Sequence, residues 1–574
     1  MPDRLEITVG QSSDKGRKTI NQDFYAAYLP REPQLRAKGA VIALADGISS
    51  SDVGQVASQT AVRSFLEDYY ATSEAWSVKR SAQQVILATN SWLHALSRRG
   101  PHPEDRDRGY ACTLSAMVLK ATTAHIFHVG DARIYRVRDN DLEQLTEDHR
   151  IWLSRNEDYL GRALGVDRHV EIDYRSQPLE RGDIFLFVTD GVYEHIPPRV
   201  LAETIRHHGS DLDAAAKALV NEAYQQGSTD NLTVQLIRIE ALPEADIDEH
   251  QRRRTELPFP PDLEPGTDFD GFEILRELHA SHRSHVYLAR DRQSDSRVAL
   301  KTPGPDLRSD PALLDQFLTE EWIARRITNP HVIKAPLPER QKSYIYVIME
   351  FVEGKTLTQW MRDNPDPPLE KARDLVDQIA RGLRGFHRQE MVHQDIRPDN
   401  ILIDEAGIAR IIDLGATKVA GLTDGRAMAA EDRLLGTAQY SAPEYFLGAG
   451  GSPRSDVFSL GVLAYQMLTG TLPYGTRVPK ARTRAAQHKL TYDSARNHDP
   501  SLPVWVNGAL RRAVHPNPER RYADADEFAY DLRHPRREFL NTGSTPLMER
   551  HPVRFWQGVA AILAVLLGMA LALD

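Results

Sequence analysis

The sequence predicts a multidomain α+β protein with two globular domains and an apolar C-terminal helix. Length is the first reason, because 574 residues exceed one hydrophobic core at about 100–200 residues per domain. The second is an acidic, proline-rich stretch at 241–268, which lacks periodicity and is therefore typical of a solvated linker. The third is an apolar run at residues 555–573.

Composition narrows the class of protein. Hydrophobic residues make up 41% and charged residues 26% of the chain, as in folded soluble domains. The net charge of −10 argues against a nucleic-acid partner. The single cysteine, Cys112, lies in an apolar run, so we expect a buried thiol and a reducing cytoplasm. The first ten residues carry charges where a secretory signal needs an apolar core.

The first domain is predicted at 1–240, because apolar runs of strand length alternate there with helical patterns. We expect strands at Leu5–Val9, Val41–Ala45, Thr113–Leu119, His125–Val129, Ile184–Thr189 and Leu232–Ile239, and amphipathic helices at Val53–Tyr70 and Ser81–Ser97. The second domain is predicted at 269–532, with helices at Ala372–His387 and Asp456–Thr469. A polar linker at 533–554 follows it.

Acidic residues stand where apolar runs of the first domain begin or end: Asp46, Asp131, Asp190 and Asp230. A single Asp-Gly pair is usually a turn, but an ordered series at strand ends predicts converging carboxylates. Hard divalent ions such as Mg²⁺ or Mn²⁺ prefer such oxygen ligands. Two such ions can hold a phosphate and activate a water molecule.

The order of these motifs resembles the metal-dependent protein phosphatases of the 2C type over about residues 5–240. The matching pieces are NQD at 21–23, ADG at 45–47, GDARIY at 130–135, LTEDH at 145–149, TDG at 189–191 and DNLTV at 230–234. The resemblance implies a β-sandwich flanked by helices, with a dinuclear centre at one edge. It further implies that Asp46, the Gly47 carbonyl, Asp190 and Asp230 hold the metals, that Asp23 contacts one through water, and that Asp131 holds a third ion.

Two positions depart from that pattern. Lys18, with Arg17 beside it, stands where the family usually has the arginine that clamps phosphate, and lysine lacks the bidentate fork. Gln22 replaces a common glutamate before Asp23. The choice between Mg²⁺ and Mn²⁺ stays open.

The second domain contains, in order, VALK ending at Lys301, Glu320, HQDIRPDN at 393–400, DLG at 413–415 and APE at 442–444. This series resembles the bilobal eukaryotic-like protein kinases over about residues 269–532. The resemblance implies that Lys301, held by Glu320, orients the phosphates of ATP, and that Asn400 and Asp413 bind Mg²⁺. It makes Asp395 and Arg397 catalytic, assigns Met349 and Val352 of the hinge-like run 347–354 to ATP binding, and pairs Arg521 with Glu444. Thr437 matches the threonine that is typical of kinases directed at serine and threonine, so the resemblance also implies substrates of that kind.

The phosphate-covering loop lacks its three glycines, which are replaced by His279, Ser281 and Ser284. Gln394 replaces the arginine that usually receives a phosphorylated activation loop. Two interpretations therefore stay open, an active kinase or a degenerate kinase-like module that binds nucleotide or partners as a scaffold.

The run at 555–573 holds 19 residues with one polar side chain, Gln557. As a helix it would be roughly 28 Å long, close to the roughly 30 Å hydrocarbon core of a membrane. Arg550, His551 and Arg554 precede it and only Asp574 follows, which predicts a single span with both domains cytoplasmic. The sequence thus predicts a membrane-anchored enzyme that both adds and removes phosphate on protein substrates, with its own Thr417, Thr423 and Thr437 among the candidates.

Overall fold

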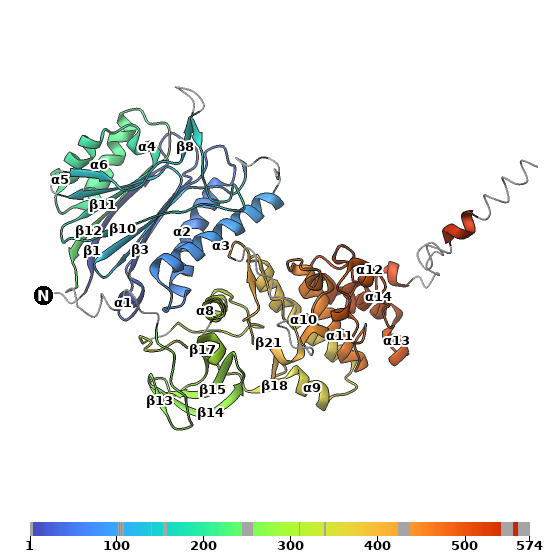
Figure 1. Ribbon diagram of the computed structural model, residues 1–574. Helices are drawn as coiled ribbons and strands as arrows, with labels where there is room; N and C mark the ends of the chain where they lie inside the picture. The colour runs from blue at the N-terminus through green and yellow to red at the C-terminus, as the bar shows by residue number, and fades with distance from the viewer. Residues whose placement is uncertain are drawn as a thin grey trace, which may run out of the picture.

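The computed structural model describes residues 4–100, 103, 105, 108–138, 141–152, 158–243, 257–308, 310–337, 340–422, 437–540 and 555–560. An antiparallel β-sandwich with helices on its outer faces comes first along the chain. A smaller sheet and a helical region follow it (Figure 1). The α+β content and the order of the two domains are therefore as predicted.

Two five-stranded antiparallel sheets form the sandwich, in the orders β1-β12-β11-β6-β7 and β10-β5-β4-β3-β2. Their strands are β1 (Glu6–Asp14), β2 (Asp23–Tyr28), β3 (Ala40–Asp46), β4 (Leu114–Lys120), β5 (Thr123–Val129), β6 (Arg133–Arg138), β7 (Asp141–Gln144), β10 (Asp173–Pro178), β11 (Ile184–Val188) and β12 (Leu232–Ala241). A separate pair is formed by β8 (Arg150–Trp152) and β9 (Asp158–Leu160). The helices are α1 (Gln34–Lys38), α2 (Gly54–Ala71), α3 (Val78–Arg99), α4 (Asp190–Tyr193), α5 (Pro198–His208) and α6 (Leu212–Gln225).

Strand β3 is buried on both faces, and its side chains alternate between two cores. Ile42 and Leu44 belong to the core between the sheets, together with Phe187 of the opposite sheet. Val41 and Ala43 belong to the core shared with α2 and α3. A strand buried on both faces reads as a continuous apolar run, which is why the sequence predicted this strand. Helices α5 and α6 cover the outer face of the other sheet.

The predicted strands correspond to β1, β3, β4, β5, β11 and β12, and the two predicted helices correspond to α2 and α3. The sequence did not predict β2, β6, β7 or β10. β6, β7 and β10 are partly exposed and carry charged side chains among their apolar ones, so no apolar run marks them. β2 does contain an apolar run, at residues 24–28, which the sequence analysis did not assign to a strand.

The second domain begins with an antiparallel sheet in the order β13-β14-β15-β16-β17. Its strands are β13 (Asp268–Phe269), β14 (Phe272–Ala280), β15 (Ser284–Asp291), β16 (Arg297–Pro303) and β17 (Val347–Glu350), and α8 (Pro311–Arg326) packs beside them. A second, mainly helical lobe follows. It contains α9 (Leu357–Asp363), α10 (Leu369–His387), α11 (Pro453–Thr469), α12 (Arg484–His488), α13 (Ala495–His498), α14 (Val504–Ala513), α15 (Ala525–Arg533) and α16 (Arg537–Leu540).

Short elements of the second lobe carry the motifs. They are the strands β18 (Gly354–Thr356), β19 (Met391–Val392), β20 (Ile401–Asp404), β21 (Ala409–Ile411) and β22 (Lys418–Val419), and the 3₁₀ helices η3 (Pro398–Asn400), η4 (Thr437–Gln439) and η5 (Pro443–Leu447). The predicted helices at Ala372–His387 and Asp456–Thr469 lie within α10 and α11.

The region predicted as a solvated linker is packed in its second half. Leu263 is buried in one cluster with Phe269 and Ile274, and the Ile345 amide donates a hydrogen bond to the Pro258 carbonyl at 3.0 Å. The expectation of a solvated linker is therefore wrong for residues 257–268. Sequence periodicity cannot reveal one apolar side chain that docks on a sheet formed by later residues.

The predicted membrane span falls mainly on residues 561–574, which lie outside the described residues. Of the helices within the described ranges, none combines the length and the apolar character that crossing a membrane requires. The span therefore stays a prediction.

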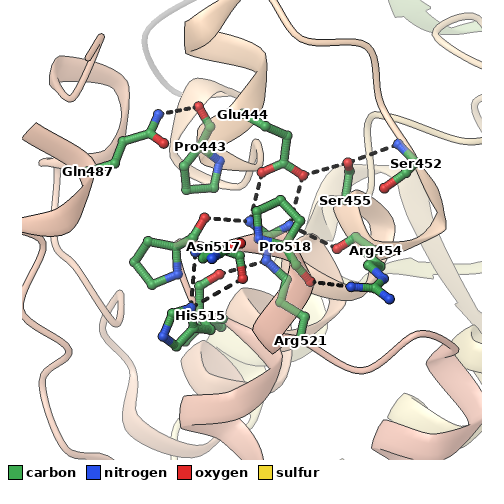
Figure 2. A network of polar contacts seen from close by, with 12 residues as sticks. Pro443, Glu444, Ser452, Arg454, Ser455, Gln487, His515, Asn517, Pro518 and Arg521 are labelled. Carbon is green, nitrogen blue, oxygen red and sulfur yellow. Dashed lines mark hydrogen bonds and ion pairs between the residues drawn. The ribbon is translucent and has the colours of Figure 1, made fainter. Parts of the chain in front are cut away.

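Arg521 and Glu444 form a buried ion pair in the second lobe of the second domain (Figure 2). Arg521 donates two hydrogen bonds to Glu444, at 2.8 and 2.7 Å, and its side chain is 0% exposed. Its other hydrogen bonds go to the carbonyls of His515, Arg454 and Pro516. The pair predicted from the sequence is thus confirmed, and a buried pair of this kind is stable only because its donors are satisfied.

Replacing Arg521 by methionine is expected to leave the buried Glu444 carboxylate without a cationic partner, with the Ser455 hydroxyl still donating a hydrogen bond to it at 2.7 Å. The free energy of local unfolding should fall by about 3–5 kcal/mol, measured by amide hydrogen exchange of α11 in the full chain. Arg381→Met, which removes an exposed pair with Asp377, is the control and should change it by about 0–1 kcal/mol. Equal exchange in the two variants would contradict the role of the buried pair.

Candidate active sites

Acidic residues of the first domain meet at one end of the sandwich. Asp23 and Asp46 are direct partners in the register of β2 and β3. Asp190 begins α4 immediately after β11, and Asp230 lies just before β12, the neighbour of β11 in the sheet. Asp131 follows β5. The fold therefore brings together residues that are as far apart as 207 positions in the sequence, from 23 to 230.

These carboxylates lie near one another; Asp23 and Asp131 are buried, and Asp46, Asp190 and Asp230 are partly buried. Burial raises the pKa of Asp46 well above its usual range, and the nearby charges of Asp23 and Asp190 raise it further. Burial is also the main cause that raises the pKa of Asp190 to about 7 and that of Asp23 to about 6. A cation among them would favour their ionised forms, because opposite charge lowers the pKa of a carboxyl group.

Hydroxyl groups from the other sheet hold Asp23. Thr189 and Thr233 donate hydrogen bonds to its Oδ2 at 3.1 and 2.6 Å. Its Oδ1 is buried, and among the described residues it has no hydrogen-bond partner. A buried acceptor without a partner is unfavourable, so this oxygen fits a water molecule bound to a cation.

The oxygen donors at this end of the sandwich fit hard divalent cations. Within the described ranges, no three Asp, Glu, His or Cys side chains converge closely enough to enclose one ion. Mg²⁺ usually keeps several water ligands and binds one or two carboxylates. A pair of carboxylates is therefore enough to hold it, and a cluster of three is not required. Gly47 lies directly against the start of α2, where a Cβ would overlap the backbone of Gly54. Glycine at this position therefore allows the helix to begin beside the site.

The two basic residues before the site point in different directions. Lys18 Nζ lies 2.7 Å from Asp230 Oδ1. Arg17 donates hydrogen bonds to the carbonyls of Gly227 and Ser228 and stacks over the Tyr224 ring at 5.0 Å. Lys18, and not Arg17, therefore supplies positive charge at the carboxylates.

Arg150 is a residue of the site that the sequence analysis did not single out. Its guanidinium lies 2.9 Å from Asp131, 3.3 Å from Asp190 and 2.6 Å from Glu194. It places a positive charge at Asp131, where a third ion was predicted, so an ion there would have to displace it. The sequence offered one indication of this role, because Arg150 directly follows the LTEDH motif. Only the fold shows that Arg150 lies beside Asp131 and Asp190.

In the second domain, the predicted lysine and its partners are in contact. Lys301 on β16 lies 2.8 and 2.7 Å from the two oxygens of Glu320 on α8, and 3.4 Å from Asp413. Burial would lower the pKa of Lys301, but the charges of Asp413 and Glu320 outweigh it and raise the pKa. Lys301 in turn lowers the pKa of Asp413. The lysine and Asp413 therefore stabilise each other's charged forms.

The predicted catalytic loop lies beside this cluster. Asn400 donates hydrogen bonds to Asp395, to its Oδ2 and to its carbonyl, both at 2.9 Å. Burial raises the pKa of Asp395, and the charge of Asp413 adds to the effect, whereas the charge of Arg397 opposes it. Arg397 also forms an ion pair with Asp399. The loop thus holds an acidic group near the Asp413 carboxylate.

Asp456 on helix α11 holds the backbone of the same loop in place. Asp456 accepts hydrogen bonds from the backbone amides of His393 and Gln394, both at 2.9 Å. Gln394 has φ 67°, an uncommon conformation for a residue with a side chain. The two amide bonds to one buried carboxylate hold the backbone in it. Next to this anchored backbone, the Asp395 side chain accepts a hydrogen bond from Asn400.

The remaining predicted positions are placed as follows. Met349 is buried on β17, and Val352 is half-buried in the connection between the lobes. The β14–β15 turn, which lacks glycine, is closed by the Ser281 amide on the Ser284 carbonyl at 2.9 Å, and Arg283 accepts from the Gly304 amide at 2.8 Å. Of the candidate phosphorylation sites, Thr417 has a buried hydroxyl. Thr423 lies outside the described residues, as does the Thr437 side chain.

Comparisons with known proteins agree with this division. A family model for protein phosphatase 2C matches residues 11–235, and a model for the protein kinase domain matches residues 272–531. Serine/threonine-protein kinase PrkC of Bacillus subtilis is 29% identical over 264 residues, which cover 46% of this chain and 40% of PrkC. The chain therefore spans less than half the length of that relative.

Two solved structures are also similar. The catalytic domain of the serine threonine protein phosphatase PstP, in complex with two manganese ions, is 24% identical. That likeness covers 41% of this chain and 100% of the other, with a TM-score of 0.35. The Mycobacterium tuberculosis PknI kinase domain is 23% identical and covers 48% of this chain and 99% of its own, with a TM-score of 0.37. The chain therefore carries a protein phosphatase 2C domain over residues 11–235 and a protein kinase domain over residues 272–531.

Proposed function

We propose that this protein is a bifunctional enzyme, a protein serine/threonine phosphatase at 1–240 and a protein serine/threonine kinase at 269–532, with residues 257–268 packed on the kinase domain. The observation that carries the proposal is the pair of separate acidic sites, one around Asp46 and one around Asp413. Asp46 and Asp413 are both partly buried, and each site has a cationic side chain of this protein beside it. Phosphate chemistry requires such sites, because cations must offset the charge of the phosphate.

In the phosphatase domain, the proposed metal ligands are Asp46, the Gly47 carbonyl, Asp190 and Asp230. Two Mg²⁺ or Mn²⁺ ions, when bound, would hold the phosphate and lower the pKa of a water molecule. Asp23 would hold a metal-bound water through its unpartnered Oδ1. Lys18 would contribute positive charge on the side where the substrate phosphate enters.

Asp190→Asn is expected to lower phosphatase turnover more than about 100-fold, since changes behind a metal ligand alone cost about 10–100-fold. The measurement is phosphate release from a phosphoserine peptide by the full chain with added MnCl₂. Asp141→Asn, at an exposed position of β7, should leave turnover unchanged. Normal turnover of the Asp190 variant would refute the ligand assignment.

In the kinase domain, Lys301 and Glu320 would orient the α- and β-phosphates of ATP, and Asp413 and Asn400 would bind its Mg²⁺. Asp395 would accept the hydrogen bond of the substrate hydroxyl, and Arg397 would offset charge at the γ-phosphate. The contact between Lys301 and Glu320 favours an active kinase, because phosphoryl transfer depends on that pair. The alternative, a kinase-like scaffold, is favoured by the turn at 281–284, which has no glycine to approach phosphate.

Asp395→Asn separates these two functions. If the domain is an active kinase, the variant should lose about 10²–10⁴-fold in turnover, the usual contribution of a general base, while retaining ATP binding. The assay is transfer of labelled phosphate from ATP in an Asp190→Asn background, which prevents removal of the product. Asp363→Asn at the exposed end of α9 is the control. If the chain with an intact Asp395 binds ATP but transfers no label, the scaffold is the correct function.

The substrates proposed are proteins and phosphoproteins, this chain included, because one chain that carries both domains keeps them at high effective concentration. We also propose that residues 555–573 anchor the chain in a membrane with both domains cytoplasmic. The basis is the apolar sequence of that run and the basic residues before it.

Deleting residues 555–574 tests the anchor. The full chain is expected in the membrane fraction of lysed cells and the shortened chain in the supernatant, because no charged residue interrupts the apolar run. Fractionation with immunoblotting measures the distribution. Recovery of the full chain in the supernatant without detergent would contradict the anchor.

A further inference from the structure

Helix α8 of the kinase domain lies against the phosphatase domain (Figure 1). This helix carries Glu320, the partner of Lys301. Helix α2 of the phosphatase domain packs along it, and Arg80 on α3 forms an ion pair with Asp315 near its beginning. Residues of both domains therefore surround the element that supplies one half of the kinase ion pair.

Arg325 forms the central polar contact. Its Nη1 lies 3.3 Å from the Ala71 carbonyl and 3.5 Å from the Thr72 carbonyl, at the C-terminal end of α2. Carbonyls at a helix end lack partners within the helix, and a cation there is favoured. The other end of the guanidinium bonds Glu321 at 2.5 Å, and Glu321 also pairs with Lys342. The Arg325 side chain is 3% exposed, so this contact is shielded from water.

Two further contacts come from the same face of α8. Arg326 forms an ion pair with Asp68 of α2 at 3.0 Å, with both side chains largely buried. The ring of Trp322, which is fully buried, lies 6.3 Å from that of Trp76. Residues three and four positions apart share one side of a helix. Trp322, Arg325 and Arg326 therefore form one continuous contact with the phosphatase domain.

The opposite side of α8 faces the kinase site. Glu320 bonds Lys301, and Gln316, four positions earlier, donates a hydrogen bond to the Gly415 carbonyl of the DLG motif. With 100° of rotation per residue, Glu320 and Trp322 point in nearly opposite directions. A shift of α8 away from α2 would thus also move Glu320.

We propose that the phosphatase domain is a built-in positioning element of the kinase, in which α2 holds α8 so that Glu320 stays on Lys301. Arg325 is the positioning residue, because it ties α8 to the C-terminal end of α2. The inference rests on the kinase activity proposed above. It assigns the phosphatase domain a second role that requires no phosphatase chemistry.

The test compares full-length variants in two assays. Arg325→Met removes the guanidinium and keeps an apolar stem; it should lower the kinase kcat about ten-fold, within the usual range for coupling between sites. The KM for ATP should change less than about three-fold, because the loss concerns orientation in the transition state. Arg325→Lys should recover most of the rate. Arg199→Met, which removes an exposed pair with Glu203 on α5 of the phosphatase domain, is the matched control and should behave as the unsubstituted chain.

Amide hydrogen exchange of residues 311–326 supplies a readout that is independent of activity. Exchange should be faster in Arg325→Met and unchanged in Arg199→Met, while release of phosphate from a phosphopeptide stays within about two-fold. If Arg325→Met also loses phosphatase activity, Asp68→Asn, which removes only the ion pair with Arg326, decides by the same two readouts. Unchanged exchange and unchanged kcat would overturn the proposal. If the unsubstituted chain forms no ADP, the kinase function fails, and exchange alone decides whether α2 holds α8.

Discussion

Partial burial of neighbouring acidic side chains is the constraint on which both candidate sites depend. In the phosphatase domain, burial is the main cause that raises the pKa values of Asp23, Asp46 and Asp190, and the charges of neighbouring carboxylates add to it. Side chains of the protein offset part of this charge, with Lys18 at Asp230 and Arg150 at Asp131. Divalent cations, when bound, would neutralise the negative charge that these side chains leave.

The kinase domain meets the same constraint with one lysine. Lys301 lies between Glu320 and Asp413, lowers the pKa of Asp413, and holds both carboxylates at the interface of the two lobes. Burial raises the pKa of Asp395, although the charge of Arg397 opposes that rise. Asp413 and Asp395 are therefore suited to different roles in the site. Asp413 stays ionised and suits a metal ion, whereas Asp395, hydrogen-bonded to Asn400, suits contact with a hydroxyl group.

Much of both candidate sites could be predicted from the sequence, because the chemistry requires particular residue types at positions where apolar runs end. Asp46 and Asp190 were found in this way, whereas Lys301 and the Glu444–Arg521 pair were found from their motifs. Arg150 and the packed segment 257–268 were missed. Their roles depend on where the chain folds back, and neither hydrophobic periodicity nor charge pattern encodes that. The same holds for Arg17, which bonds backbone carbonyls although it stands beside the phosphate-clamp position.

The sequence by itself determined the two domains, the strands buried on both faces and the order of the acidic and basic motifs, because each of these is a local property of neighbouring residues. Only the tertiary structure decided which face of α8 meets α2, where Arg150 points and how Lys18 and Arg17 divide their roles. These features depend on contacts between residues far apart in the chain, such as Arg325 with Ala71. Such contacts follow from the packing of whole elements, which one stretch of sequence does not specify.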